Sequence, residues 1–206
     1  MERQTNDKIV RFLKDNIEPL EDSAYGLGYR VSVYLIDGTF LPCVIFRNSK
    51  TVVNLAIRRF KEELSGKSVF SHSSGLGYYD IVKNFVTSGN CINDYDIKSV
   101  EKSRFAFPLS IQKQIRGETT MGWTGFAAKM KDGKYFGFGT TFLYEFFQMP
   151  DGYSVEDIEE IINHSYVLKT GELRSHKVPF LETPSDYEEA VIYRERPFFE
   201  CFLDNL

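Results

Sequence analysis

Apolar positions in the first part of the chain follow two different periods. Ile9, Phe12, Leu13 and Ile17 fall on one face at helical spacing, and either Thr5 or Asn6 is placed to cap the helix that they predict. Further along, the spacing changes to that of strands and then returns to that of a helix. The pattern predicts a helix at residues 6–20, strands at 29–36 and 40–46, and a helix at 51–64.

The two expected strands are joined by Asp37-Gly38. An Asp-Gly pair between apolar runs is typical of a two-residue type I′ hairpin turn, because both central positions of that turn need positive φ. We expect Gly26 and Gly28 to break the chain before the first strand. Pro42 falls inside the second strand and indicates an edge or a bulge, because proline cannot donate a ladder hydrogen bond.

The second half of the chain repeats this order of elements. Pro108 suits the first position of a helix, Asp132-Gly133 is a second hairpin turn, and Ser154 with Asp157 fits a capping box. The pattern predicts a helix at 108–115, strands at 126–130 and 135–147, and a helix at 154–163. The stretches 6–65 and 106–165 would then both be αββα units, either by tandem duplication or as two independent uses of a common arrangement.

The remaining segments give weaker signals. We expect a loop at 65–78, a short helix at 80–86, a strand at 104–107, a hairpin from 166–168 and 173–180, a short helix at 183–190, and extended segments at 191–193 and 198–203. No linker rich in Pro or Gly divides the chain. The prediction is therefore an α+β fold of antiparallel hairpins with packed helices. It forms one compact domain over residues 1–206, with a C-terminal extension at 166–206.

Composition adds an aromatic content of 15%, much of which is expected in the core, while some tyrosines could instead line a recognition surface. The net charge of −4 argues against a non-specific nucleic-acid binder, which usually has a basic surface. Cys43, Cys91 and Cys201 are far apart and form no CxxC motif, so we expect free thiols in a reducing compartment. The polar N-terminus and the lack of a long apolar run predict a soluble, cytoplasmic protein without a membrane span.

The three histidines have no metal-binding or catalytic spacing, so we expect no metal, no cofactor and no catalytic residue. His72 lies beside serines in the expected loop, where adjacent Ser and His rarely form a working pair. His164 would lie at the C-terminus of a helix, where the helix dipole favours a cation. His176 would be a solvated strand residue.

Residues 116–125 are the most promising binding segment. They hold the only Trp of the chain, Trp123, among glycines, with Arg116 and Glu118 beside it. Loops between rigid elements concentrate binding residues, and Trp and Arg are enriched at binding hot spots. We predict that these three residues and Tyr135 line a contact surface. The alternative is that Trp123 closes the core under a glycine-dependent turn.

Three functions remain open from the sequence. The first is a non-catalytic binding or accessory protein of the inhibitor or immunity type, which captures another protein through an aromatic and acidic surface. The second is a small hydrolase with a dispersed active site, for example His72 with Glu118 or Arg116. The third is a sheet-based nucleic-acid binder that uses exposed aromatic side chains together with Arg58, Arg59, Arg104 and Arg116.

Overall fold

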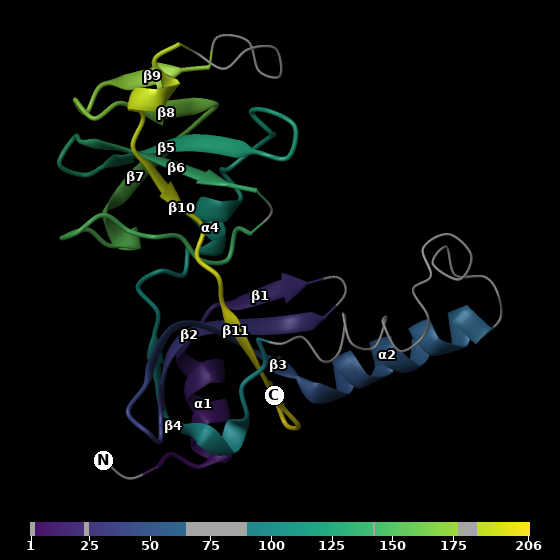
Figure 1. Ribbon diagram of the computed structural model, residues 1–206. Coiled ribbons are helices and arrows are strands. Elements are labelled where there is room, and N and C mark those ends of the chain that lie inside the picture. Colours follow the sequence, from purple (N-terminus) through teal and green to yellow (C-terminus); the bar gives the residue numbers. More distant parts are fainter. Residues whose placement is uncertain (1–2, 23–24, 65–89, 142, 177–184) are drawn as a thin grey trace. The chain divides into compact units, whose positions relative to one another are not determined.

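The computed structural model describes residues 3–22, 25–64, 90–141, 143–176 and 185–206 (Figure 1). Within these residues the chain is α+β, as the sequence predicts. It divides into two compact units, Met1–Lys102 with Phe198–Leu206, and Ser103–Pro197. The expected extension at 166–206 is therefore shared between them. The expected loop at 65–78 and helix at 80–86 lie outside the described residues. No described helix is long and apolar enough to cross a membrane.

The first unit is built on a sheet whose long strand β2 pairs with β1, β3 and β4 (Figure 1). Both β1 and β4 run antiparallel to β2, as β3 does, while β11 returns from the end of the chain and runs parallel to β3. The elements are α1 Asn6–Asn16, β1 Pro19–Asp22, β2 Gly26–Leu35, β3 Phe40–Asn48, α2 Ser49–Leu64, the 3-10 helix η1 Asp94–Asp96, β4 Ile97–Lys102 and β11 Phe199–Leu203.

Helix α1 supplies one side of the first core. Of the two expected caps the structure selects Thr5, because its side-chain oxygen accepts a hydrogen bond from the N–H of Lys8. The helix ends at Asn16 rather than at residue 20. Pro19 begins β1, and proline disfavours helical backbone at the residue before it. The core contains Ile9, Leu13, Val31, Val33, Val44, Phe46, Ile97 and Leu203.

The glycines and the proline before and inside this hairpin behave differently from one another. Gly26 and Gly28 were expected to break the chain but lie inside β2, where Gly28 makes room for the side chains of Ile45 and Arg47. The bulge expected at Pro42 is confirmed. The ladder between β2 and β3 shifts register there, and the Pro42 carbonyl accepts a hydrogen bond from Ser32 Oγ at 2.8 Å.

Both Asp-Gly pairs form hairpin turns, but the turns are not type I′. The N–H of Gly38 donates to Leu35 O at 3.0 Å, and the N–H of Gly133 donates to Met130 O at 2.8 Å. Only the glycine of each pair has positive φ, +91° and +88°. Each aspartate instead accepts the N–H two residues later in an Asx turn, which explains why Asp suits a position that does not require positive φ.

The second unit contains a four-stranded sheet in the order β10-β6-β5-β7, and a separate pair, β8 with β9 (Figure 1). Its core contains Phe107, Phe126, Phe138, Phe147, Met130, Met149 and Ile158. The elements are α4 Leu109–Gln112, β5 Thr124–Met130, β6 Tyr135–Thr140, the 3-10 helix η2 Val155–Asp157, β7 Ile158–Asn163, β8 Ser165–Val167, β9 Leu173–Ser175, the 3-10 helix η3 Tyr187–Glu189 and β10 Ile192–Arg194.

The prediction of a helix at 154–163 is wrong. The capping box of Ser154 and Asp157 is present, but it begins only the short helix η2, and the chain continues as β7. Ile158 and Ile161 are buried three residues apart, a spacing that also fits a helix face, so the apolar pattern is ambiguous. Pairing with β5 decides the outcome. The strand predicted at 104–107 is also absent, and the sheet strand before it is β4.

The two units share a strand order. In each, a hairpin forms the centre, a third strand runs antiparallel to the first hairpin strand, and a fourth strand runs parallel to the second. The order is β4-β2-β3-β11 in the first unit and β7-β5-β6-β10 in the second. Because β7 replaces the expected helix, residues 106–165 do not have αββα order, and the tandem duplication stays a prediction.

Candidate functional site

Trp123 is the last residue of a tight turn that precedes β5. Its N–H donates to Thr120 O at 2.9 Å, and its carbonyl accepts from the N–H of Thr119 and of Thr120. Gly122 has a φ of +72°, a conformation that a turn of this kind needs and that glycine adopts without strain. Met121 stands at the tip of the turn and is 92% exposed. The turn therefore fixes Trp123 and presents an apolar side chain to solvent.

The indole ring of Trp123 packs against the backbone of two glycines rather than against side chains. Gly125 and Gly139 are partners in the ladder between β5 and β6. A Cβ on Gly139 would lie 2.1 Å from Cζ2 of Trp123, and a Cβ on Gly125 would lie 3.3 Å from its Nε1. The close approach of an aromatic ring to the strands explains the glycines in the alternating segment of β6.

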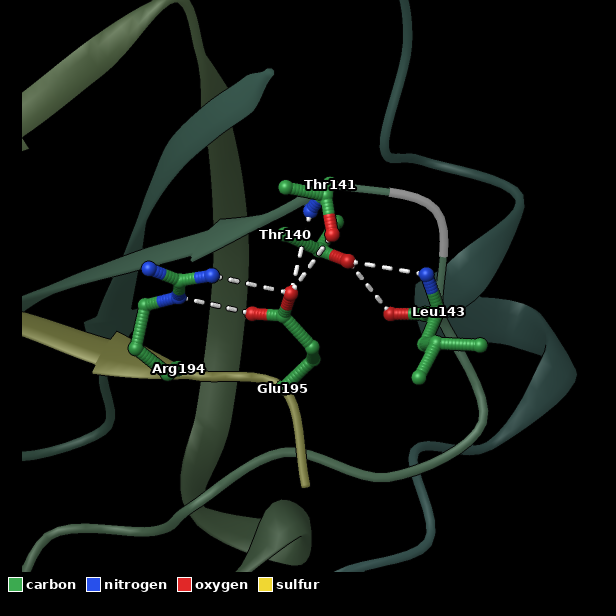
Figure 2. A network of polar contacts seen from close by, with 5 residues as sticks. All are labelled: Thr140, Thr141, Leu143, Arg194 and Glu195. Atoms are coloured by element: carbon green, nitrogen blue, oxygen red, sulfur yellow. Dashed lines mark hydrogen bonds and ion pairs between the residues drawn. The ribbon is translucent and has the colours of Figure 1, made fainter. Parts of the chain in front are cut away.

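The guanidinium of Arg194, the last residue of β10, lies over the face of the indole ring. Its guanidinium carbon lies 4.7 Å from the centroid of the Trp123 ring, which is cation–π distance. The guanidinium also pairs with Glu195 through Nε to Oε2 at 2.8 Å and Nη2 to Oε1 at 3.1 Å (Figure 2). Thr141 donates to the same Oε1 from its N–H and its hydroxyl. Arg194 is therefore fixed in a planar, two-bond geometry.

These contacts set the charge of Glu195. Burial of the carboxyl raises its pKa, but the hydrogen bonds from Arg194 and Thr141 outweigh this effect and lower the pKa to about 2. Glu195 is consequently ionised throughout the neutral range, and its negative charge neutralises much of the charge on Arg194. The guanidinium offers a flat stacking surface with reduced net charge.

A pocket of about 390 Å³ opens beside this stack. Its volume lies within the range of sites that take a small ligand or a large side chain. The wall is mostly apolar and aromatic, with few polar groups. It is formed by Thr120, Trp123, His176, Tyr187, Ile192 and Arg194.

His176 is the buried polar residue of the pocket. It is only 8% exposed, and its ring packs against those of Tyr166 and Tyr187, with centroids 5.0 and 5.4 Å away. Burial, together with the nearby His164, lowers the pKa of His176 and favours the neutral ring. The Nε2 atom is buried and has no hydrogen-bond partner among the described residues. A ligand with a matching polar group would satisfy this atom.

The Trp123 indole N–H is also buried. It lies close enough to the Tyr187 hydroxyl to lower the pKa of Tyr187, although burial, the larger effect, raises that pKa. The two groups do not meet the geometry of a hydrogen bond, and the indole N–H has no other partner in the described part of the chain.

The predicted site residues occupy different places. Glu118 is exposed and accepts the N–H of Gly122 at 3.3 Å, so it supports the turn that carries Trp123. Arg116 is exposed, and its backbone N–H donates to Asn163 Oδ1 at 2.8 Å. Tyr135 pairs with Lys129 at the other end of the hairpin and does not join the pocket. The structure therefore brings Trp123 and Glu118 into one turn and separates Tyr135 from them.

Sequence reasoning missed four pocket residues, His176, Tyr187, Ile192 and Arg194. His176 was expected in solvent but is buried, because Tyr166 and Tyr187 cover it. Tyr187 and Arg194 come from segments far from Trp123 in the sequence, and no local spacing connects them. His164 does not lie at a helix end, since the predicted helix is β7, and the helix-dipole explanation is wrong. It has a φ of +52°, and its ring lies against Gly117.

Comparisons with known proteins give no further guidance. The chain matches no protein-family model, no curated protein and no solved structure. Within the described residues, no group of three or more His, Cys, Asp or Glu side chains is arranged to hold a metal ion. The pocket geometry is therefore the main basis for a functional proposal.

Proposed function

We propose that this chain is a non-catalytic binding protein, of the accessory or inhibitor type, that holds another protein through the Trp123 pocket. The observation that carries the proposal is the pocket itself, in which the sole Trp is fixed between glycine backbone and the Arg194 guanidinium. Trp and Arg side chains in well-packed surface pockets are typical of binding hot spots. The site of action is the cytoplasm, where the free cysteines would remain reduced.

A protein partner is favoured over a small molecule by Met121. This side chain stands almost fully in solvent on the turn that also supplies Thr120 and Trp123 to the pocket. A small ligand inside the pocket would leave Met121 unused, whereas a protein surface can cover both. We expect a partner side chain that is largely apolar or aromatic to enter the pocket. A polar group on this side chain would form a hydrogen bond with His176 Nε2.

The two other functions have less support. The hydrolase hypothesis relied on His72, which lies outside the described residues, and on Glu118, whose carboxylate supports a turn. The arginines of the nucleic-acid hypothesis are divided between the units. Arg58 belongs to the first, and Arg104 and Arg116 belong to the second.

Site-specific photo-crosslinking of the full chain in cells tests the proposal. A photoreactive amino acid at Met121 is expected to give one discrete adduct with a protein. Tyr187→Ala, which removes a pocket wall, should reduce that adduct about tenfold or more. The matched control places the photoreactive group at Tyr135, at the far end of the hairpin of β5 and β6 that follows this turn. An adduct that survives Tyr187→Ala, or that forms equally from position 135, would contradict the proposal.

A further inference from the structure

The turns of the two hairpins have the same pattern of backbone hydrogen bonds and register shifts, which we call the frame. The N–H of Leu35 donates to Thr39 O, and the N–H of Met130 donates to Lys134 O, both at 2.8 Å. Immediately before each turn, the ladder with the third strand shifts register, between Tyr34 and Leu35 in one unit and between Lys129 and Met130 in the other.

The contact between each turn and the short helix before the third strand is also the same. Ile36 donates its N–H to Asp96 O, and Lys131 donates its N–H to Asp157 O, both at 2.9 Å. These bonds align the two hairpin ends residue by residue. The matched pairs are Tyr34 with Lys129, Ile36 with Lys131, Phe40 with Tyr135, and Tyr95 with Glu156.

In the second unit this end carries the side chains of an ordinary solvated hairpin. Lys131 and Glu156 are exposed. Lys129 reaches Glu159 with Nζ to Oε2 at 2.8 Å. The second unit therefore shows that the frame forms with charged residues at three of the four positions, Lys129, Lys131 and Glu156, while the fourth, Tyr135, is aromatic in both units.

In the first unit the matched positions are apolar and exposed. Tyr34, Ile36, Phe40 and Tyr95, the hairpin patch, are exposed by 38%, 56%, 43% and 58%. The rings of Tyr34 and Phe40 touch, with centroids 4.8 Å apart. Single exposed apolar residues are normal, but a contiguous group is typical of an interaction surface. The frame does not require apolar side chains at Tyr34, Ile36 and Tyr95, and the bond from Ile36 to Asp96 brings the turn beside the segment that carries Tyr95. The exposure of these side chains at one end of the hairpin therefore points to a partner.

Charges around the patch indicate the chemistry of that partner. The segments 34–40 and 93–99 hold Asp37, Asp94 and Asp96 against Lys98, and Arg3 adds a second cation that donates to the carbonyl of Asp94. Asp37 is exposed at the turn, and the backbone N–H and side chain of Thr39 lower its pKa, so it is ionised at neutral pH. An apolar surface with an acidic border is complementary to apolar side chains flanked by basic ones.

We propose that the hairpin patch docks a protein segment that combines apolar side chains with lysine or arginine. This inference does not depend on the Trp123 pocket, which belongs to the other unit. It gives the chain a second interaction surface with a different preference. The pocket takes a single inserted side chain, whereas the patch covers a flat, amphipathic segment.

Two labelled synthetic peptides of equal length serve as probes, one with alternating Leu and Lys and one with alternating Leu and Glu. Fluorescence anisotropy with the full chain should show binding of the Leu/Lys peptide and none of the Leu/Glu peptide. Tyr34→Lys with Ile36→Lys installs the residues of the second unit and should weaken binding at least about tenfold. Asp37→Asn preserves the Asx turn and should weaken binding of the Leu/Lys peptide by a smaller factor. The remaining binding should depend less on salt than that of the wild type.

The second unit supplies the control. Lys131→Ala changes the matched position and should leave peptide binding unchanged, as should the pocket variant Tyr187→Ala, which separates this proposal from the proposed function. Thermal melts should confirm that the double variant is folded, since its side chains occur on the same frame elsewhere in the chain. Undiminished binding by the double variant, or no binding by the wild type, overturns the proposal. So does concentration-dependent dimerisation that the double variant abolishes, because the occupant would then be a second copy.

Discussion

The indole ring of Trp123 lies so close to Gly139 that no other residue type fits beneath it. A Cβ at position 139 would lie 2.1 Å from Cζ2 and 2.5 Å from Cη2 of the ring. On the next strand Gly125, the ladder partner of Gly139, is less crowded, with 3.3 Å to Nε1. The pocket therefore depends on a residue that contributes no side chain to it.

Gly139→Ala should consequently displace the indole and open the pocket. We expect a loss of about 1–3 kcal/mol in the free energy of unfolding, as for other overpacked sites, and a red-shifted Trp emission. Because Trp123 is the only Trp, the emission reports this site alone. Gly125→Ala serves as a milder control. It should cause a smaller loss in the free energy of unfolding and a smaller red shift of the Trp emission. Equal effects of the two variants would show that the ring is not held by Gly139.

The carboxylate of Glu195 should make the stability of the protein sensitive to acid. Its pKa falls from the ordinary value of 4.5 to about 2, so its contribution is fully present above 4.5 and is lost as the pH falls toward about 2. Glu195→Gln should cost about 1–3 kcal/mol at neutral pH, the usual effect of removing hydrogen bonds to a charged group. The cost should shrink as urea unfolding is repeated at decreasing pH.

Glu172→Gln is a suitable control for that experiment. Glu172 also pairs with an arginine, Arg174, at 3.0 Å, but the Glu172 side chain is 54% exposed, whereas that of Glu195 is 9% exposed. Exposed pairs of this kind contribute about 0–1 kcal/mol. A similar loss in both variants would mean that Glu195 has no special role in holding Arg194 over the ring.

The turn glycines Gly38 and Gly133 offer a matched pair of substitutions. Both have φ near +90°, and a Cβ on either would meet nothing within 4 Å. The cost of Gly→Ala therefore comes from backbone conformation alone and should be about 1–2 kcal/mol at each site. Chemical denaturation of the two variants measures it. Costs that differ by more than about 1 kcal/mol would show that the two turns are not equivalent.

The cysteines should differ in reactivity. Cys91 is exposed, whereas Cys43 and Cys201 are buried, and all three are free thiols. Burial, with smaller effects of Asp94 and Cys91, raises the pKa of Cys201 to about 12. A disulfide reagent, which is attacked by thiolates and releases one of its halves as a thiolate, should thus modify one thiol in the folded protein. Without reductant, all three should react after denaturation, and a lower count would indicate a disulfide.

Local signals in the sequence were sufficient for the α+β class, a helix cap at Thr5 or Asn6, the bulge at Pro42 and both hairpin positions. Each depends on a property of one or two residues, such as the missing N–H of proline or the φ range of glycine. The strand β7 was predicted as a helix, because a capping box and the three-residue spacing of Ile158 and Ile161 fit both structures. Only pairing with β5, which is a tertiary contact, decides between them.

The candidate site shows the same limit. Trp123 could be singled out by composition, and its turn by its glycines. The rest of the pocket could not, because its residues come from distant segments. Pairing of β10 with β6 brings Arg194 to the site, while Tyr187 lies in the 3-10 helix η3 and His176 directly follows β9. The polarity of His176 argued for solvent exposure, and only two tyrosine rings from other segments explain its burial.

His176 should titrate below the usual range for histidine. Burial and the charge of His164 lower its pKa from 6.5, so the unfolded chain takes up the proton more readily than the folded one. The contribution of the neutral ring is therefore present above about 6.5 and is lost as the pH falls through that value toward the folded pKa. Histidine proton resonances measured by NMR between neutral pH and about pH 5 give the folded pKa directly.

Two variants separate the causes of this shift. His176→Phe keeps a ring against Tyr166 and Tyr187 and should make unfolding less dependent on pH below about 6.5. His164→Asn removes the neighbouring charge and tolerates the positive φ at position 164, so it should raise the pKa of His176 without restoring the usual value, because burial is the larger cause. A His176 resonance that titrates at or above 6.5 in the wild type would mean that water reaches the ring. The pocket would then lack the buried nitrogen that its ligand is expected to meet.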